Sequence, residues 1–143
     1  MGNLSAFLKK NKKEKKTTEY PATKSLCDEN GEPLKWTIRA LTTKESERIR
    51  EECTTEIPVT GKPGMYRNKV NTHKLLTKMI CAAVVYPDLN AVELQNSYGV
   101  MCAEDLIDEM VDNPDEFGNF AAFVQQYSGF EETLQEKVDE AKN

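Results

Sequence analysis

The chain has 143 residues, of which 38% are hydrophobic and 30% charged, and its formal net charge is -5. This length fits one domain that buries about two thirds of the surface exposed by its unfolded chain. No segment approaches the roughly 20 apolar residues of a membrane span, and the N-terminus has no hydrophobic signal core, so we expect a soluble protein with no membrane partner. Because the cysteines form no CxxC pair and only one histidine is present, we expect free thiols in a reducing cytoplasm, no metal site and no cofactor. These residues are Cys27, Cys53, Cys81, Cys102 and His73.

The charge is distributed unevenly along the chain. Residues 1–16 hold six lysines and one glutamate, residues 17–87 hold eleven bases and nine acids, and residues 88–143 hold two lysines and fourteen acids. The basic first segment has no arginine, and no aromatic residue interleaves its lysines to stack on bases, so we expect no nucleic acid partner. Residues 1–16 are therefore predicted to be a flexible, lysine-rich leader, and a small nucleic-acid-binding regulatory protein that uses this leader is the alternative function.

Residues 17–143 are predicted to form a single domain that opens with an antiparallel β-hairpin. Residues 34–40 alternate between apolar and polar side chains, as a half-buried strand does, and residues 17–27 are the natural partner strand. The connection fits either a two-residue Asn30-Gly31 turn or a three-residue loop with Gly31 in the left-handed conformation. We expect the second register, because it gathers the apolar side chains of both strands on one face. It pairs Leu26 with Leu34, Ala22 with Ile38 and Tyr20 with Ala40.

A short surface helix and a long connection are expected next. Thr42 and Glu45 have the spacing of a capping box, which predicts that a helix begins there. Residues 54–70 contain two prolines and two glycines and predict a long irregular loop. Gly61 and Lys62 suggest a phosphate-binding loop, but the full GxxxxGK[ST] pattern is absent.

The most strongly apolar helix is expected to follow. It begins at Asn71 or Thr72 and continues to Tyr86, before Pro87. Because this helix is apolar nearly all round beyond its first turns, we expect the remaining elements to pack about it. Its principal apolar stripe comprises Leu75, Leu76, Met79, Ile80, Ala83 and Val84.

Several shorter helices complete the predicted fold. Asn90 is expected to cap one helix that closes at Gly99, residues 101–111 have helical spacing, and Asn113 is expected to cap another helix within residues 113–129. The fold class is therefore α+β, mainly α, with the N-terminal hairpin followed by a bundle of about five to six helices around one central apolar helix.

The polar stretch at residues 95–99 is the strongest candidate for a catalytic site. A nucleophile elbow requires the pattern GxSxG after a strand, but Gln95 stands where the first glycine is needed before Ser97. A hydrolase using Ser97 or Cys102 with His73 would need these groups to meet, and no spaced acid and base set supports it. We therefore expect a turn between helices, no enzymatic activity and no catalytic residues.

Three collinear blocks resemble the XkdN-like family of phage tail assembly chaperones. They are "KWTIRALTTKESERIREECT" at residues 35–54, "VTGKPGMY" at residues 59–66 and "AAVVYPDLNAVELQNSYGVMCAEDLI" at residues 82–107. The resemblance covers roughly residues 17–130 and is more specific than any single motif.

The resemblance implies a protein of phage or prophage tail assembly. Such a chaperone binds the tape measure protein in the cytoplasm of the bacterial host and keeps it soluble until the tail tube polymerises around it. It is absent from the mature virion, and many such genes also yield a longer product by ribosomal frameshifting. The tail tube protein and further copies of the chain are additional candidate partners. The family has no catalytic residues that could be transferred to this chain.

The last predicted helix, residues 130–142, is the candidate partner-binding site. Its narrow apolar stripe lies beneath a dense acidic face. The helix either docks on its own domain or projects from it towards a groove of a partner. We expect the stripe to contact the client or another copy of the chain. It consists of Phe130, Leu134 and Val138.

Overall fold

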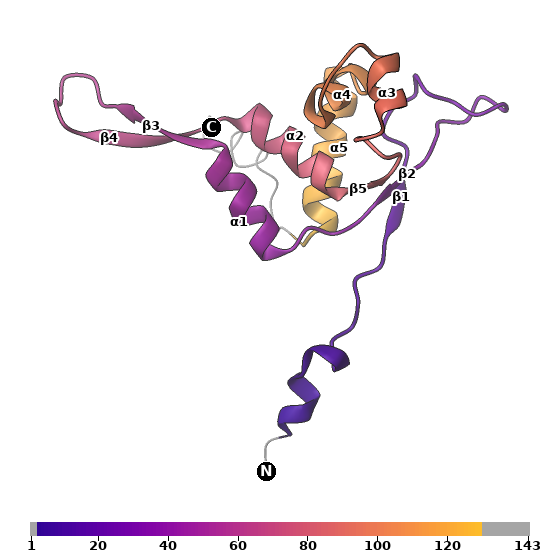
Figure 1. Ribbon diagram of the computed structural model, residues 1–143, viewed down its shortest axis with the longest axis horizontal. Coiled ribbons are helices and arrows are strands. Elements are labelled where there is room, and N and C mark those ends of the chain that lie inside the picture. The colour runs from indigo at the N-terminus through magenta and orange to yellow at the C-terminus, as the bar shows by residue number, and fades with distance from the viewer. Residues whose placement is uncertain (1–2, 130–143) are drawn as a thin grey trace.

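The computed structural model describes residues 3–129 of the chain (Figure 1). The α+β class is as predicted, with five α-helices and antiparallel strands within these residues. None of the helices in this part of the chain has the length and apolar character of a membrane span. The predicted last helix, residues 130–142, lies outside the described residues.

The leader extends away from the body of the protein (Figure 1). It contains two short 3-10 helices, η1 (Leu4–Phe7) and η2 (Lys9–Asn11), and neither has a buried residue. The C-terminal end of the leader contacts the domain: the hydroxyl of Tyr127 donates a hydrogen bond to the carbonyl oxygen of Lys16. The N-terminal segment therefore meets the domain at the end of the last described helix.

A three-stranded antiparallel sheet has the order β1-β2-β5. Its strands are β1 (Thr18–Tyr20), β2 (Trp36–Ile38) and β5 (Val84–Tyr86). In the central strand β2 the side chains of Trp36 and Ile38 are buried, as their alternation predicts.

The loop between β1 and β2 has the predicted form. The Asp28 N–H donates to the carbonyl oxygen of Glu32 at 2.8 Å and closes a three-residue loop in which Gly31 has a φ of 81°. The predicted pair of Leu26 and Leu34 is also present, with 2.8 Å between the Leu34 nitrogen and the Leu26 oxygen.

The register predicted for the rest of the hairpin is wrong. The Thr23 hydroxyl donates to one Glu116 carboxylate oxygen at 2.7 Å, and the Lys24 N–H donates to the other at 2.7 Å. These contacts with a distant helix hold this part of the first strand in a turn outside the ladder, and they shift the pairing of β1. The pairs found are Thr18 with Ile38 and Tyr20 with Trp36, whereas the predicted pairs of Ala22 with Ile38 and Tyr20 with Ala40 do not form.

The first helix, α1 (Thr43–Glu52), begins with the predicted capping box. The Glu45 N–H donates to the Thr42 hydroxyl at 3.2 Å, and the Thr42 N–H donates to the Glu45 carboxylate at 3.1 Å. Ile49 is buried and anchors the helix to the core, while most of its other residues are exposed.

The prediction of an irregular loop over residues 54–70 is wrong. This segment forms an antiparallel hairpin of β3 (Thr54–Pro58) and β4 (Tyr66–Val70), which projects from the body of the protein (Figure 1). Gly61 and Gly64 turn the chain with positive φ angles of 79° and 81°. Most of the hairpin is exposed, so its strands lack the apolar alternation by which half-buried strands are recognised.

The second helix, α2 (Thr72–Ala83), is the apolar helix that the sequence predicts. The Asn71 side chain caps it by accepting a hydrogen bond of 3.1 Å from the Lys74 N–H. α2 contacts α1, α4, α5 and β5. Its buried residues are Leu75, Leu76, Thr77, Met79, Ile80 and Ala83.

The predicted continuation of this helix to Tyr86 is wrong. The helix ends at Ala83, whose carbonyl oxygen accepts a hydrogen bond of 2.9 Å from the Arg39 N–H, and Val84–Tyr86 form β5 against β2. Pairing with a strand more than 40 residues earlier in the sequence thus replaces helical hydrogen bonds. An apolar run of this kind suits a buried helix and a strand equally well, and only the tertiary pairing distinguishes them.

The polar stretch at residues 95–99 is a helix and its turn, as predicted, but its cap is not Asn90. α3 (Val92–Ser97) has Ala91 as its N-cap residue, and the Asn90 N–H instead donates to the Asp88 carboxylate at 3.0 Å. Gly99 has the expected left-handed conformation, with a φ of 68°.

Two amphipathic helices complete the described fold, α4 (Ala103–Met110) and α5 (Pro114–Tyr127). Asn113 caps α5 as predicted, accepting hydrogen bonds from the N–H groups of Asp115 at 2.9 Å and Glu116 at 3.1 Å. Both helices bury the apolar residues that have helical spacing, which are Leu106, Ile107, Met110, Val111, Phe120 and Val124.

Aromatic contacts join α5 to the sheet. The Trp36 and Phe120 rings meet edge to face with 5.5 Å between their centroids. Tyr20 stacks on Phe120 at 5.4 Å and on Phe123 at 4.3 Å. These rings attach β1 and β2 to the helices and build one continuous core.

Candidate functional site

The three predicted partner-binding residues, Phe130, Leu134 and Val138, lie outside the described residues. The structure does describe the place from which their segment leaves the domain. This place is the end of α5, where Ser128 follows the helix and Gly129 has a φ of 99°.

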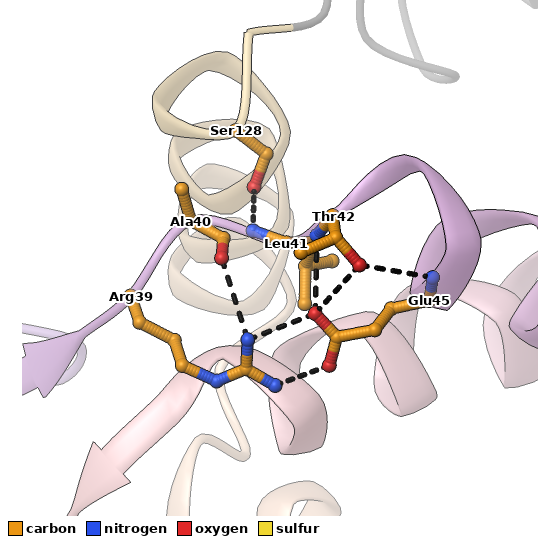
Figure 2. A network of polar contacts seen from close by, with 6 residues as sticks. All are labelled: Arg39, Ala40, Leu41, Thr42, Glu45 and Ser128. Carbon is orange, nitrogen blue, oxygen red and sulfur yellow. Dashed lines mark hydrogen bonds and ion pairs between the residues drawn. The ribbon is translucent and has the colours of Figure 1, made fainter. Parts of the chain in front are cut away.

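A polar network fixes the end of α5 against the start of α1 (Figure 2). The Leu41 N–H donates a hydrogen bond of 2.9 Å to the hydroxyl oxygen of Ser128. Leu41 is buried, so the hydroxyl gives this N–H a partner where water is excluded. This bond holds Ser128, the residue that follows α5, at the beginning of α1.

The same network contains a two-pronged ion pair. Arg39 Nη1 donates to Glu45 Oε1 at 2.9 Å, and Arg39 Nη2 pairs with Glu45 Oε2. Hydrogen bonding from Arg39, followed by that from Thr42, lowers the pKa of the Glu45 carboxyl from 4.5 to about 2, against the opposing effect of burial. The pair joins the residue that follows β2 to the first turn of α1 by a two-pronged, charge-assisted contact.

The β3–β4 hairpin is the first exposed apolar surface. Met65 and Tyr66 are 55% and 63% exposed near its turn, and Val70 is exposed near its base. The hairpin is anchored by a hydrogen bond of 2.8 Å from the Asn71 N–H to the Cys53 carbonyl oxygen. This surface was not predicted, although Ile57 and the neighbouring β-branched residues, followed by turn glycines, have the composition of a hairpin.

Strand β5 is the second exposed apolar surface. It lies at one edge of the sheet and presents Val85 and Tyr86 to solvent. An edge strand leaves backbone groups open to pairing with another chain. This surface was missed because the segment was assigned to the preceding helix.

The three side chains that a hydrolase would use are His73, Ser97 and Cys102. His73 is exposed, lies 3.0 Å from a carboxylate oxygen of Asp108 and stacks on Phe117 with 5.0 Å between ring centroids. Ser97 is exposed at the end of α3, and Cys102 is half-buried before α4. The placement of His73 at the surface is as predicted.

Burial affects the thiols of two cysteines. Burial raises the pKa of Cys81 to about 12 and also raises the pKa of Cys53, so the thiolates that react with electrophiles or metals are disfavoured. Within residues 3–129, no group of three or more histidine, cysteine, aspartate or glutamate side chains is placed to hold a metal ion.

Comparison with known proteins assigns the chain to a family. Residues 4–142 match the family model of the phage XkdN-like tail assembly chaperone protein. The protein YqbN of Bacillus subtilis (strain 168) is 23% identical over 141 residues, which are 99% of this chain and 93% of YqbN. The phage-like element PBSX protein XkdN of the same organism is 22% identical over 141 residues, which are 99% of this chain and 94% of XkdN.

A solved structure has the same fold. The crystal structure of YqbN superposes with a TM-score of 0.72 at 18% sequence identity and covers 92% of this chain and 99% of that chain. The family match thus extends over nearly the whole length of the present chain, from the leader through the hairpin, the helices and the C-terminal segment. This protein belongs to the XkdN-like family of phage tail assembly chaperones.

Proposed function

We propose that the protein binds the tape measure protein of a phage or prophage and keeps it soluble until the tail tube polymerises. The observation that carries this proposal is the family match over residues 4–142. The chain acts by reversible binding, without catalysis, in the cytoplasm of the bacterial host, and is absent from the mature virion. The tail tube protein and further copies of the chain are additional partners.

The distribution of apolar and charged groups supports a binding role. A chaperone that holds a long, partly apolar client needs exposed apolar surface and enough charge to keep the complex in solution. Met65, in the turn before β4, Tyr66 on β4 and Tyr86 on β5 supply exposed apolar side chains. Residues 88–143 hold fourteen acids and two lysines, which supply the charge.

Phe130, Leu134 and Val138 are proposed to contact the client. In the sequence these residues recur at a spacing of four, the spacing of one face of a helix, and acidic residues flank them. A narrow apolar stripe of this kind fits a helical client, in which apolar positions recur at similar spacing.

Co-expression with the tape measure protein tests the proposal. The client is produced alone and together with the chaperone, and each preparation is separated into soluble and insoluble fractions. The expected result is a client that aggregates alone and co-purifies in soluble form with several copies of this chain, counted by mass measurement of the complex. A client that is equally soluble alone and does not co-purify would refute the proposed function.

A further inference from the structure

The two faces of the β3–β4 hairpin differ in charge. Residues directly opposite one another in an antiparallel ladder have their side chains on the same face. Glu56, the single acid of residues 54–70, lies on one face. The other face carries two bases and no acid, and we call it the basic face of the hairpin. It consists of two opposite pairs, Thr55 with Lys69 and Ile57 with Arg67.

A hollow of about 540 Å³ continues the basic face at the base of the hairpin. Its lining includes Cys53, Thr55, Ile57, Lys69, Val70 and Lys74. The apolar members of this set form part of the wall, and the two lysines bring positive charge. Glu52 also lines the hollow, but its carboxylate lies 3.3 Å from the ammonium group of Lys78, which offsets its charge. The hollow therefore suits an apolar side chain that is accompanied by a carboxylate.

The hairpin buries little of its own surface. Every residue of β4 is exposed, and in β3 only Thr54 and Ile57 are half-buried. A two-stranded ribbon is marginally stable in water unless a third strand or a helix packs against it. A helix that packs on the basic face would therefore stabilise the hairpin.

The outward face of α4 has the opposite charge. The buried residues of this helix point into the core, whereas Asp105, Asp108 and Glu109 are exposed on its other side. Met101, which precedes the helix, is 94% exposed. The whole segment 88–129 contains nine acids and neither lysine nor arginine, so no base within it neutralises this face.

The two surfaces complement each other. Arg67, Lys69 and Lys74 give the basic face and its hollow three positive charges, and the outward face of α4 has three negative ones. Met101 precedes Asp105 by only four residues, so α4 begins with an exposed apolar side chain followed closely by a carboxylate. This is the combination that the hollow suits. Opposite charges across an interface also fix the register in which two surfaces meet.

The two surfaces do not face each other within one molecule. The hairpin projects away from α3 and α4 (Figure 1). Its base is held by the backbone hydrogen bond between Asn71 and Cys53. α4 is held on α2, where Glu104 pairs with Lys78 at 3.3 Å. Because both elements are fixed on the same core, a second copy of the chain is the occupant that brings the surfaces together.

We propose that the hairpin of one copy docks its basic face on the outward face of α4 of a second copy. Lys69 and Lys74 pair with Asp105 and Glu109 of the second copy, whose Met101 enters the hollow. Every copy has one hairpin and one α4, so the contact is head-to-tail, and it continues to an open chain of copies or closes into a ring.

This inference deepens the proposed function, in which further copies of the chain are partners, and rests on it for the role of the assembly. A row of copies covers a long client at regular intervals. The face of the hairpin that carries Pro58 and Tyr66 stays exposed in such a row. Association itself requires no client and can be tested on the purified full-length chain.

Zero-length cross-linking of lysines to carboxylates is the first experiment. Unlabelled and isotopically labelled full-length chains are mixed in equal amounts, cross-linked and mapped by mass spectrometry. We expect Lys69 and Lys74 to be joined to Asp105 or Glu109, with labelled and unlabelled peptides in the same link. Links confined to a single isotope would show a contact within one copy. That result, an absence of these links, or links from the lysines of the leader in their place would overturn the proposal.

Charge exchange between the two surfaces is the second experiment. Sedimentation velocity at concentrations from about 1 µM to about 1 mM covers the range of weak association. Lys69→Glu/Lys74→Glu and Asp105→Lys/Glu109→Lys should each raise the dissociation constant about tenfold or more, because like charges then face each other. An equimolar mixture of the two variants should restore association, since the reversed hairpin of the first fits the reversed α4 of the second.

Lys44→Glu/Arg48→Glu is the matched control for the hairpin variant. It makes the same change in charge at exposed positions of α1 and should associate as the original chain does. Circular dichroism checks that each variant folds, and the cross-links of the original chain decide the matter for a variant that does not. An original chain that stays monomeric at about 1 mM, folded variants that fail to associate when mixed, or an equal effect of the control would refute the proposal.

The outcomes separate this inference from the proposed function. A chain that associates through these surfaces but fails to bind the tape measure protein supports the head-to-tail contact and refutes the chaperone proposal. A chain that keeps the client soluble while remaining monomeric refutes the head-to-tail contact alone. If Lys69→Glu/Lys74→Glu retains association but loses the client, the basic face binds the client and the head-to-tail contact is likewise refuted.

Discussion

The hydroxyl oxygen of Ser128 lies 2.9 Å from the backbone nitrogen of Leu41 and accepts its hydrogen bond, although the two residues are 87 positions apart in the sequence. This bond connects the end of α5 to the segment that enters α1 (Figure 2). It therefore holds Ser128, close to the last described residue, against the start of α1.

The substitution Ser128→Ala should destabilise the protein by about 1–3 kcal/mol, because it leaves the N–H of buried Leu41 without its acceptor. Denaturant unfolding measures the effect. Ser97→Ala, at an exposed position, is the matched control and should change stability by less than about 0.5 kcal/mol. Equal effects of the two substitutions would contradict a structural role for Ser128.

The Arg39–Glu45 pair predicts a pH dependence of stability. The pKa of Glu45 in the folded protein, about 2, lies below its ordinary value of 4.5. The carboxylate therefore adds stability that is fully present above pH 4.5 and is lost as the pH falls towards 2. Glu45→Gln should reduce the free energy of unfolding at pH 7 and should flatten its decrease between pH 4.5 and 2.

Unfolding curves of the original chain and the variant at several pH values measure this difference. Glu51→Gln, an exposed position on the same helix, serves as the control and should leave the pH profile unchanged. If Glu45→Gln gives the same slope below pH 4.5 as the original chain, the ion pair does not contribute to stability.

Phe120 is expected to be the most sensitive aromatic position of α5, because it is fully buried and contacts both Trp36 and Tyr20. Phe120→Ala should cost about 3–5 kcal/mol, and Phe120→Leu, which leaves a smaller cavity, should cost less. The fluorescence of Trp36, the only tryptophan, reports unfolding directly. Phe123→Ala, at a half-buried ring, should cost less than Phe120→Ala, and the reverse order would contradict the packing described here.

The apolar stripe of the C-terminal segment should be required for client binding. Leu134→Ser/Val138→Ser should abolish co-purification of the tape measure protein and leave folding of the domain intact, because it changes none of the core residues found among residues 3–129. Circular dichroism checks the fold, and affinity purification measures the client. Thr133→Ala/Gln135→Ala changes polar residues beside the stripe and should retain the client. Unchanged binding by the first variant would exclude the stripe as the contact surface.

The lysine-rich leader should not make this protein a nucleic-acid-binding regulator. We expect no retention of the full chain on DNA at an ionic strength of about 0.15 M, because the leader lacks stacking residues and the domain behind it is acidic. Fluorescence anisotropy with labelled DNA measures this. Binding that falls steeply with salt and disappears when residues 1–16 are deleted would instead support the alternative function.

The local features of the fold could be predicted from the sequence because their causes lie within a few residues. Thr42, Asn71 and Asn113 cap their helices through backbone groups two or three positions away. Gly31 closes the first hairpin because a glycine adopts positive φ without a steric penalty. The apolar spacing of the segment that forms α2 likewise indicates a core helix before any tertiary contact is known.

The exposed hairpin could not be predicted from apolar alternation. Neither β3 nor β4 packs a regular apolar face on the core, so no alternation marks them as strands. Their five residue pairs supply hydrogen bonds within the hairpin, and its base is held by the backbone bond between Asn71 and Cys53. The candidate binding surface at Met65 and Tyr66 was missed for the same reason.

The family, the α+β class, the caps at Thr42, Asn71 and Asn113 and the apolar helix α2 were predictable from the sequence, because each depends on residue type and short spacing. Only the tertiary structure decided the pairing of Val84–Tyr86 with β2 and the shift of β1 caused by Glu116. It also decided the contact of Ser128 with Leu41, which holds Ser128 against the start of α1. These features depend on backbone and side-chain groups that are tens of residues apart, and their hydrogen bonds exist only once the core has brought the elements together.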